Sequence, residues 1–195
     1  MGVFDGEFHP SALLYYTSQS NVLCLVWFGL LLARSLSGIK THGKTGPSSY
    51  NERFSALVAL SITVTMAVFW TMLAPTMDPG SLWTFRSLQP HLFTPLLVIA
   101  DYLLFASPGK LTSRDPLYSA LVPLGYWLQA TVLGLSGVVY RTSEATGAAV
   151  RFPYFFIDYD QIGWMVAVYV VAIALFFFGI AWLLLWSDRR RAGAK

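Results

Sequence analysis

Hydroxyl and amide side chains occupy residues 17–21, directly ahead of a long apolar stretch. Thr17, Ser20 and Asn21 stand at i, i+3 and i+4, so on a helix they share one face. A threonine hydroxyl becomes a nucleophile when a neighbouring base removes its proton, and nearby hydroxyl or amide donors stabilise the oxyanion that then forms. The alternative is structural: the hydroxyls bond back to their own helix, and the asparagine joins two helices.

His91 is the candidate base, and it follows Pro90 at the start of another apolar stretch. An imidazole can remove the proton of a hydroxyl nucleophile near neutral pH. The alternative is an interfacial histidine that faces water or caps its helix. The two other histidines, His9 and His42, form no pair of metal ligands at helical spacing. We therefore expect neither a metal nor a cofactor.

Three acidic or amide residues are further candidates. Asp101 follows His91 by ten residues, about 15 Å of helix rise, so it does not orient the imidazole. We expect Asp101 to be a buried hydrogen-bonding residue or to close the inner end of a cavity, and Gln129 to pack between helices. Asp158 ends the aromatic segment 152–158, which is either an interfacial belt with a helix-starting carboxylate or a re-entrant lid. The lid would bring Asp158 close to Thr17 and His91.

The composition predicts what positions these side chains. Hydrophobic residues make up 55% of the 195 residues and charged residues 12%, where a soluble domain has roughly a quarter charged residues. This excludes a soluble globular domain, and the formal charge of +3 requires no nucleic-acid partner. We predict one all-α transmembrane domain over residues 1–195, a polytopic helix bundle, since about 20 apolar residues suffice for one span. Five spans are expected, at about 11–35, 52–75, 88–107, 115–139 and 160–187.

The orientation follows from the basic residues. With the C-terminus in the cytoplasm, ten of the 13 Lys and Arg residues lie on the inner side. Arg86, Arg141 and Arg151 lie on the outer side. This bias predicts a cytoplasmic C-terminus and an external N-terminus. Thr17 and His91 then lie at similar depth, near the outer ends of the first and third spans.

Three segments together resemble a known family. Residues 15–21 resemble the segment around the threonine of the androgen-induced-gene family of membrane hydrolases, and more closely that of its bacterial relatives. Residues 91–101 are similar to the family's helix with a histidine, a proline four residues on and an acid ten residues on. Residues 152–158 are similar to its aromatic stretch ending in an acid. The resemblance covers most of the chain.

The resemblance implies an integral-membrane threonine hydrolase of a bacterial inner (cytoplasmic) membrane. Animal members cleave fatty-acid esters of hydroxy fatty acids, so the expected partners are the lipid bilayer and a fatty-acyl ester substrate. Carried over by position, Thr17 is the nucleophile and His91 the base. Asp158 would hold the imidazole, with Ser20 and Asn21 as oxyanion donors. An acyl chain needs an apolar pocket, for which we expect aromatic side chains such as Trp70, Phe93 and Phe155.

Two alternatives stay open. Family members have a further helix ahead of the threonine segment, so either this member lacks it or the natural chain begins further upstream. The rival function is a non-catalytic membrane protein that binds lipid, transports or serves as a scaffold. A transporter usually has duplicated, broken helices in two halves, and the sequence has no such halves. The polar residues instead gather at the outer end.

Overall fold

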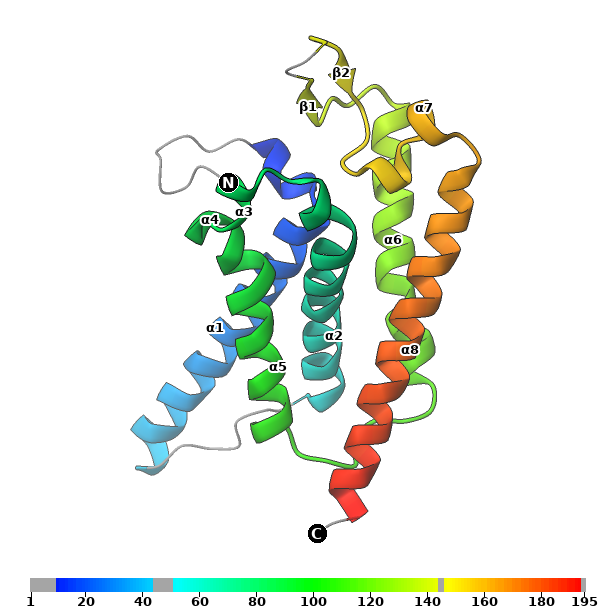
Figure 1. Ribbon diagram of the computed structural model, residues 1–195. Coiled ribbons are helices and arrows are strands. Elements are labelled where there is room, and N and C mark those ends of the chain that lie inside the picture. The colour runs from blue at the N-terminus through cyan, green and yellow to red at the C-terminus, as the bar shows by residue number, and fades with distance from the viewer. Residues whose placement is uncertain (1–9, 44–50, 144–145, 194–195) are drawn as a thin grey trace.

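The structure is a computed structural model that describes residues 10–43, 51–143 and 146–193. Most of these residues are helical (Figure 1). Within them, four helical stretches are long and apolar enough to cross a membrane: Tyr16–Thr41, Glu52–Thr76, Phe85–Phe105 and Met165–Gly193. The described residues thus form the predicted helical bundle, and the four stretches are compatible with the predicted membrane protein.

The first helix, α1 (Tyr16–His42), lies further along the chain than the predicted span of 11–35. A short 3-10 helix, η1 (Pro10–Leu14), precedes it, and Tyr15 between the two has an extended backbone with φ −82° and ψ 140°. Thr17 is consequently the second residue of α1. Backbone N–H groups in the first turn of a helix have no partner within the helix, so that of Thr17 can bind another part of the chain.

The central helix is α2 (Glu52–Val68). Half of the apolar window of this stretch is buried inside the bundle, against 11% for α1, so α2 packs on both sides while α1 exposes most of its surface. Its side chains meet α1 and α5 in one core and α8 in another. The first core includes Trp27, Ile62, Val98 and Tyr102, and the second consists of Leu60, Val64, Phe177 and Ala181.

The second apolar stretch ends in a π-helical turn. α2 continues into η2 (Phe69–Leu73), which is π-helical, and then into the short 3-10 helix η3 (Ala74–Thr76). The short helices α3 (Pro79–Leu82) and α4 (Phe85–Leu88) follow. Isolated π-helical turns inside α-helices are rare and occur frequently at functional sites.

A second π-helical turn, η4 (Gln89–Phe93), leads into α5 (Thr94–Phe105). Proline is one physical reason for this interruption, because it has no N–H to continue the helical ladder. Pro95 cannot donate to the carbonyl of His91 four residues earlier. The indole Nε1–H of Trp70 donates to that carbonyl instead, at 3.0 Å, and so joins η2 to η4.

The C-terminal half of the bundle consists of α6 (Asp115–Leu135) and α8 (Met165–Gly193), which lie side by side in Figure 1. Pro123 and Gln129 make α6 less apolar than the four stretches above, although its 21 residues equal the shortest of them in length. The connection between α6 and α8 contains a hairpin of β1 (Arg141–Thr142) and β2 (Ala149–Val150) in antiparallel register. The 3-10 helix η5 (Phe155–Ile157) and the short helix α7 (Tyr159–Ile162) follow.

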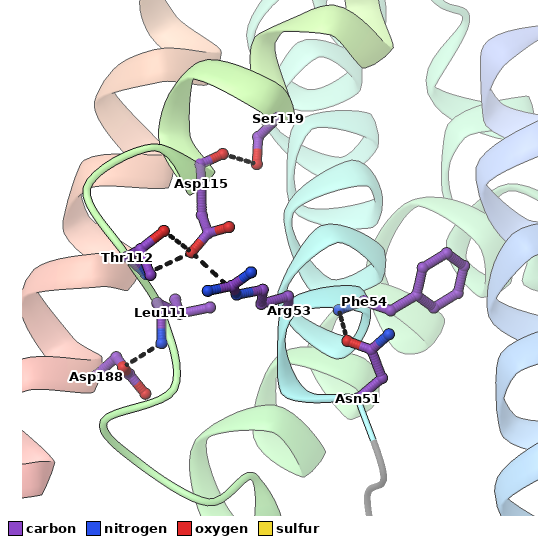
Figure 2. Close-up of polar contacts among 8 residues, drawn as sticks. All are labelled: Asn51, Arg53, Phe54, Leu111, Thr112, Asp115, Ser119 and Asp188. Carbon is purple, nitrogen blue, oxygen red and sulfur yellow. Dashed lines mark hydrogen bonds and ion pairs between the residues drawn. The ribbon is translucent and has the colours of Figure 1, made fainter.

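The hairpin, η5 and α7 lie at the end of the bundle where α1 begins, which we call the threonine end (Figure 1). The opposite end, where α2 and α6 begin and α5 ends, we call the basic end. Its charged side chains bind backbone groups of the loop between α5 and α6. Figure 2 shows Asp188 Oδ2 accepting a hydrogen bond from the Leu111 N–H at 3.0 Å, and Asp115 accepting from Thr112.

Arg191 also binds the end of α5. Its Nη1 donates to the carbonyls of Tyr102, Leu103 and Ala106 at 3.4, 2.9 and 3.4 Å. The last carbonyls of a helix have no partner within it, so a guanidinium is well suited to bind them. Asp188 is 1% exposed and lies 3.9 Å from Arg191 Nη2. Asp188 and Arg191 thus fasten α8 to α5 and to the loop that follows it.

Candidate functional site

Thr17 lies where α1 meets the segment between the hairpin and α7. Its backbone N–H donates to the Tyr154 hydroxyl at 3.5 Å, and the Thr17 side chain also interacts with that hydroxyl. Burial raises the pKa of Tyr154 above its ordinary value, while its hydrogen bonds with Thr17 act in the opposite direction. Tyr154 is therefore a neutral phenol at physiological pH and can serve as a hydrogen-bond donor, not as a base.

Ser20 and Asn21 both bind the carbonyl oxygen of Thr17. Ser20 Oγ lies 3.0 Å from it and Asn21 Nδ2 2.8 Å. Ser20 Oγ is also 2.7 Å from Thr65 Oγ1, and Asn21 Nδ2 is 3.4 Å from the Pro90 carbonyl. These bonds fix the first turn of α1 against α2 and η4, at the level of His91. The two side chains expected as oxyanion donors thus stabilise the helix start that carries Thr17.

His91 is held in one tautomer by its own helix. Nδ1 lies 2.8 Å from the Ser87 carbonyl oxygen, which can only accept. Nδ1 therefore carries a proton, and in the neutral ring Nε2 holds the free lone pair. The imidazole stacks on the ring of Phe69, with centroids 3.6 Å apart and planes at 7°. His91 is oriented as a base, and one of its faces is covered by an aromatic ring.

A narrow apolar pocket opens beside Thr17, between α1, α2, α6, α8 and η5. It holds about 650 Å³ of empty space, counting its open mouth. Besides its tyrosines, the wall contains two residues with a hydroxyl group, Thr17 and Thr65. His91 is not part of the wall, but Phe69 is. Phe69 therefore contacts both the pocket and the imidazole. The large aromatic residues of the wall are Tyr16, Phe69, Tyr126, Trp127, Tyr154, Phe156 and Phe177.

The aromatic side chains expected in the pocket wall lie elsewhere. Trp70 donates to the His91 carbonyl, Phe93 is 44% exposed and Phe155 is 37% exposed. In two of the three cases the neighbouring residue takes the expected place, Phe69 beside Trp70 and Phe156 beside Phe155. Successive residues of a helix point about 100° apart, so an error of one position moves a side chain to a different face.

Asp158 caps the start of α7. Its Oδ1 accepts from the backbone N–H groups of Asp160 and Gln161 at 3.0 and 3.3 Å, and its Oδ2 accepts from Gln161 Nε2 at 2.7 Å. The structure therefore shows the helix-starting carboxylate, the first of the two interpretations. Within the described residues, the hydrogen bonds of Asp158 go to α7 and none goes to His91. Its segment nonetheless reaches the site, through Tyr154.

Gln129 and Asp101 lie outside the pocket wall. Gln129 Oε1 accepts from Gln19 Nε2 at 3.4 Å, a contact that joins α6 to α1 close to Thr17. Gln19 Nε2 also donates to the Leu13 carbonyl at 3.2 Å. Asp101 is half-buried on α5, one turn before its end, and no hydrogen bond to its carboxylate is found in the part of the chain described.

The sequence did not lead us to three features of the site: Tyr154, Phe69 and the two π-helical turns. Tyr154 belongs to the aromatic segment 152–158. It is the one residue of that segment that adds a hydroxyl to an aromatic ring, among phenylalanines at 152, 155 and 156, and this could have marked it as a site residue. Phe69 had no local signal, because it stands in a long apolar stretch. The π-helical turns that hold Phe69 and His91 had a partial signal in the prolines at 90 and 95.

Comparisons of this chain with protein-family models, with characterised proteins and with solved structures give no match.

Proposed function

We propose that this chain is an integral-membrane hydrolase of long-chain fatty-acyl esters, with Thr17 as the nucleophile and His91 as the base. The proposal includes the relationship to the bacterial branch of the androgen-induced-gene family that residues 15–21, 91–101 and 152–158 suggest. The observation that carries it is the position of Thr17. This residue lies in the first turn of α1 at the wall of an apolar pocket and contacts the hydroxyl of a neutral tyrosine.

The pocket supports a fatty-acyl ester as the substrate. Its wall is mostly aliphatic and aromatic, with the hydroxyl groups of Thr17, Thr65 and three tyrosines, which is typical of sites for apolar ligands. An acyl chain would occupy the apolar part, which would leave the ester carbonyl beside the hydroxyl of Thr17. Water reaches such a pocket poorly, which favours hydrogen bonds to the developing oxyanion.

In the proposed reaction, His91 Nε2 takes the proton of Thr17 Oγ1 while that oxygen attacks the ester carbonyl. The bond to the leaving alcohol then breaks, and the alcohol departs with the proton. Water attacks the acyl-threonine next, which releases the fatty acid and restores the threonine hydroxyl. Tyr154 takes the role of oxyanion donor, in place of Ser20 and Asn21, which bind the Thr17 carbonyl.

The proposal requires a local movement of Phe69. Its ring stacks on the imidazole and also faces the pocket, so it must turn aside before His91 can reach the threonine. Catalytic hydrogen bonds are often long without substrate and tighten when it binds. Phe69 belongs to a π-helical turn, where the backbone ladder is already irregular.

The same ring favours a second candidate function, a lipid-binding protein without catalysis. In that case Phe69 permanently separates the imidazole from the pocket, and the pocket holds an acyl chain as a bound ligand. The two functions differ in whether a covalent adduct forms on Thr17.

The test is labelling of the purified chain with a fluorophosphonate lipid probe, followed by mass mapping and by hydrolysis assays on long-chain esters. We expect an adduct on Thr17 in the wild-type chain and in Thr17→Ser, and none in the nearly isosteric Thr17→Val. His91→Ala should lower hydrolysis by about 10²- to 10⁴-fold. Folding of each variant is checked by its melting temperature. If folded wild-type protein gives no adduct and cleaves no ester of the panel, the lipid-binding function replaces the hydrolase.

The proposed topology has five spans, with α6 as the additional one, an external N-terminus and a cytoplasmic C-terminus. The 21 residues of α6 rise about 30 Å, the thickness of the hydrocarbon core. The test replaces Cys24 by Ala and introduces Asp78→Cys or Arg114→Cys, followed by a membrane-impermeant maleimide on intact cells. We expect labelling at position 78 alone; labelling at position 114 in intact cells would reverse the orientation.

A further inference from the structure

A second pocket lies at the basic end, between α2, α6 and α8. It contains about 820 Å³ of empty space, counting its open mouth. Leu57, Val122 and Leu184 give it apolar walls, one from each of the three helices. Arg53 and Asp115 are its charged residues. The pocket thus has an apolar interior within apolar helices and a charged group near the ends of those helices.

This pocket is separate from the one beside Thr17, although α2, α6 and α8 contribute to the walls of both. Leu60 and Ala181 belong to its wall, whereas Val64 and Phe177 belong to the wall of the pocket at the threonine end. The four side chains pack together in one core cluster and are 5% exposed or less. This buried layer of α2 and α8 side chains lies between the two cavities, so a ligand at the basic end does not have to enter the proposed catalytic site.

Arg53 is available to a ligand. Its side chain is 58% exposed, and its Nε lies 3.7 Å from Asp115 Oδ2. That carboxylate is already bound by the backbone N–H and the hydroxyl of Thr112, as Figure 2 shows. Asp115 therefore does not depend on Arg53, and no acceptor for the two Nη atoms is found among the residues that the structure describes. Two guanidinium N–H groups can bind two oxygens of a phosphate together.

The surroundings of the mouth favour an anion. α2 and α6 both begin there, and helix N-termini carry partial positive charge. Lys110 and Arg114 stand in the loop that leads into α6, and the acidic side chains of this region already bind backbone N–H groups. Basic pockets between transmembrane helices are typical binding sites for the head groups of anionic lipids.

We propose that this pocket binds an anionic phospholipid of the surrounding bilayer, with the lipid phosphate on Arg53 and one acyl chain between α2, α6 and α8. Charge complementarity selects the head group, and the apolar walls select a chain over a free anion. The site is independent of hydrolysis at Thr17. The bound lipid adds to the contact between α2 and α6 at this end, where the Arg53–Asp115 ion pair already joins the two helices.

The experiment measures phospholipid retained by the full chain in native mass spectra, after exchange into micelles with equal amounts of phosphatidylglycerol and phosphatidylcholine. We expect a preference for phosphatidylglycerol of about five- to tenfold, since one basic residue near a membrane surface contributes about 1 kcal/mol. Arg53→Gln should abolish the preference. Arg53→Lys should keep most of it. Arg189→Gln is the matched control, because it removes an exposed charge of the same end that lies outside the pocket wall, and it should leave the preference unchanged.

Val122→Trp tests the acyl chain separately, because it fills the apolar part and leaves Arg53 in place. We expect this variant to lose bound phospholipid while its melting temperature remains within a few degrees of the wild type. Equal retention of the two lipids by the wild-type chain would overturn the proposal. So would an unchanged preference in Arg53→Gln, retention in Val122→Trp, or complete displacement of the lipid by inorganic phosphate, which would indicate a site for free anions.

Discussion

The two ends of the bundle both bury polar groups, but they use them differently. At the basic end the buried groups are charged, and Asp188 and Arg191 bind backbone N–H and carbonyl groups that α5 and its loop leave without partners. At the threonine end the buried groups are mainly neutral hydroxyls and amides, apart from the buried carboxylate of Asp158, which caps α7. Ser20 and Thr65 bind each other, whereas Thr17 faces a cavity. A buried charge in a membrane protein is therefore not in itself a sign of a catalytic site. Its hydrogen-bond partners distinguish a structural role from a catalytic one.

The largest expected effect comes from breaking the basic end. Asp188→Ala removes the counter-ion of Arg191 and the acceptor of the Leu111 N–H, both at a position that is 1% exposed. We expect the free energy of unfolding to fall by roughly 3 kcal/mol. The measurement is reversible unfolding in mixed micelles. Asp188→Asn retains an acceptor and should lose less; a loss under about 1 kcal/mol in Asp188→Ala would mean that these contacts are not structural.

Gly134→Ala should disturb the threonine end. A Cβ at this position would collide with the ring of Phe152 and lie 2.8 Å from the Arg151 carbonyl oxygen. We expect a loss of about 1–3 kcal/mol in stability. Ester hydrolysis should fall with it, because Tyr154 follows two residues after Phe152.

Gly125→Ala is the matched control in the same helix, since nothing lies within 4 Å of the added Cβ. It should keep activity and gain up to about 1 kcal/mol from helix propensity. Equal stability and equal ester hydrolysis in Gly134→Ala and Gly125→Ala would show that the close approach of Phe152 to α6 does not position Tyr154.

Tyr154→Phe tests whether the neutral hydroxyl at the threonine end serves chemistry or structure. Loss of its hydrogen bonds should cost about 1 kcal/mol of stability. Hydrolysis should fall by about 10²- to 10³-fold if the hydroxyl stabilises the oxyanion. A proportionate, small fall in activity would favour the purely structural role.

The same variant has a signature at high pH. Burial raises the folded-state pKa of Tyr154 above its ordinary value of 10.0. Its contribution to stability is therefore complete below pH 10 and is lost as the pH rises through the folded-state pKa. Melting temperatures between pH 8 and 11.5 should fall more steeply in the wild type than in Tyr154→Phe; parallel curves would contradict this.

The smallest effect is expected from Asp160→Ala. It removes the ion pair in which Arg151 Nη2 lies 2.5 Å from Asp160 Oδ1, between side chains that are 39% and 48% exposed. Exposed ion pairs contribute little and are screened by salt. We expect a change in melting temperature smaller than in any variant above, and one that disappears in 0.5 M salt. A large fall in melting temperature would show that this ion pair, like Asp188, contributes substantially to stability.

Much of the threonine end could be predicted from residue types and spacing. The periodicity placed Thr17, Ser20 and Asn21 on one helix face, and the Asn21 amide does reach the Pro90 carbonyl next to His91. The role of Asp158 could not be predicted, because a carboxylate ahead of a helix and one beside an imidazole have the same local sequence. The choice depends on where its segment folds.

The sequence by itself determined that this chain is all-α, with helices apolar enough to cross a membrane and with its hydroxyl cluster near the start of one of them. These properties depend on composition and on short-range periodicity, which need no knowledge of distant contacts. Only the tertiary structure decided that Phe69 lies against His91 and that Tyr154 contacts Thr17. Both contacts join segments far apart in the chain, and each depends on the rotation of a helix about its axis, which apolar stretches in a bilayer leave unspecified.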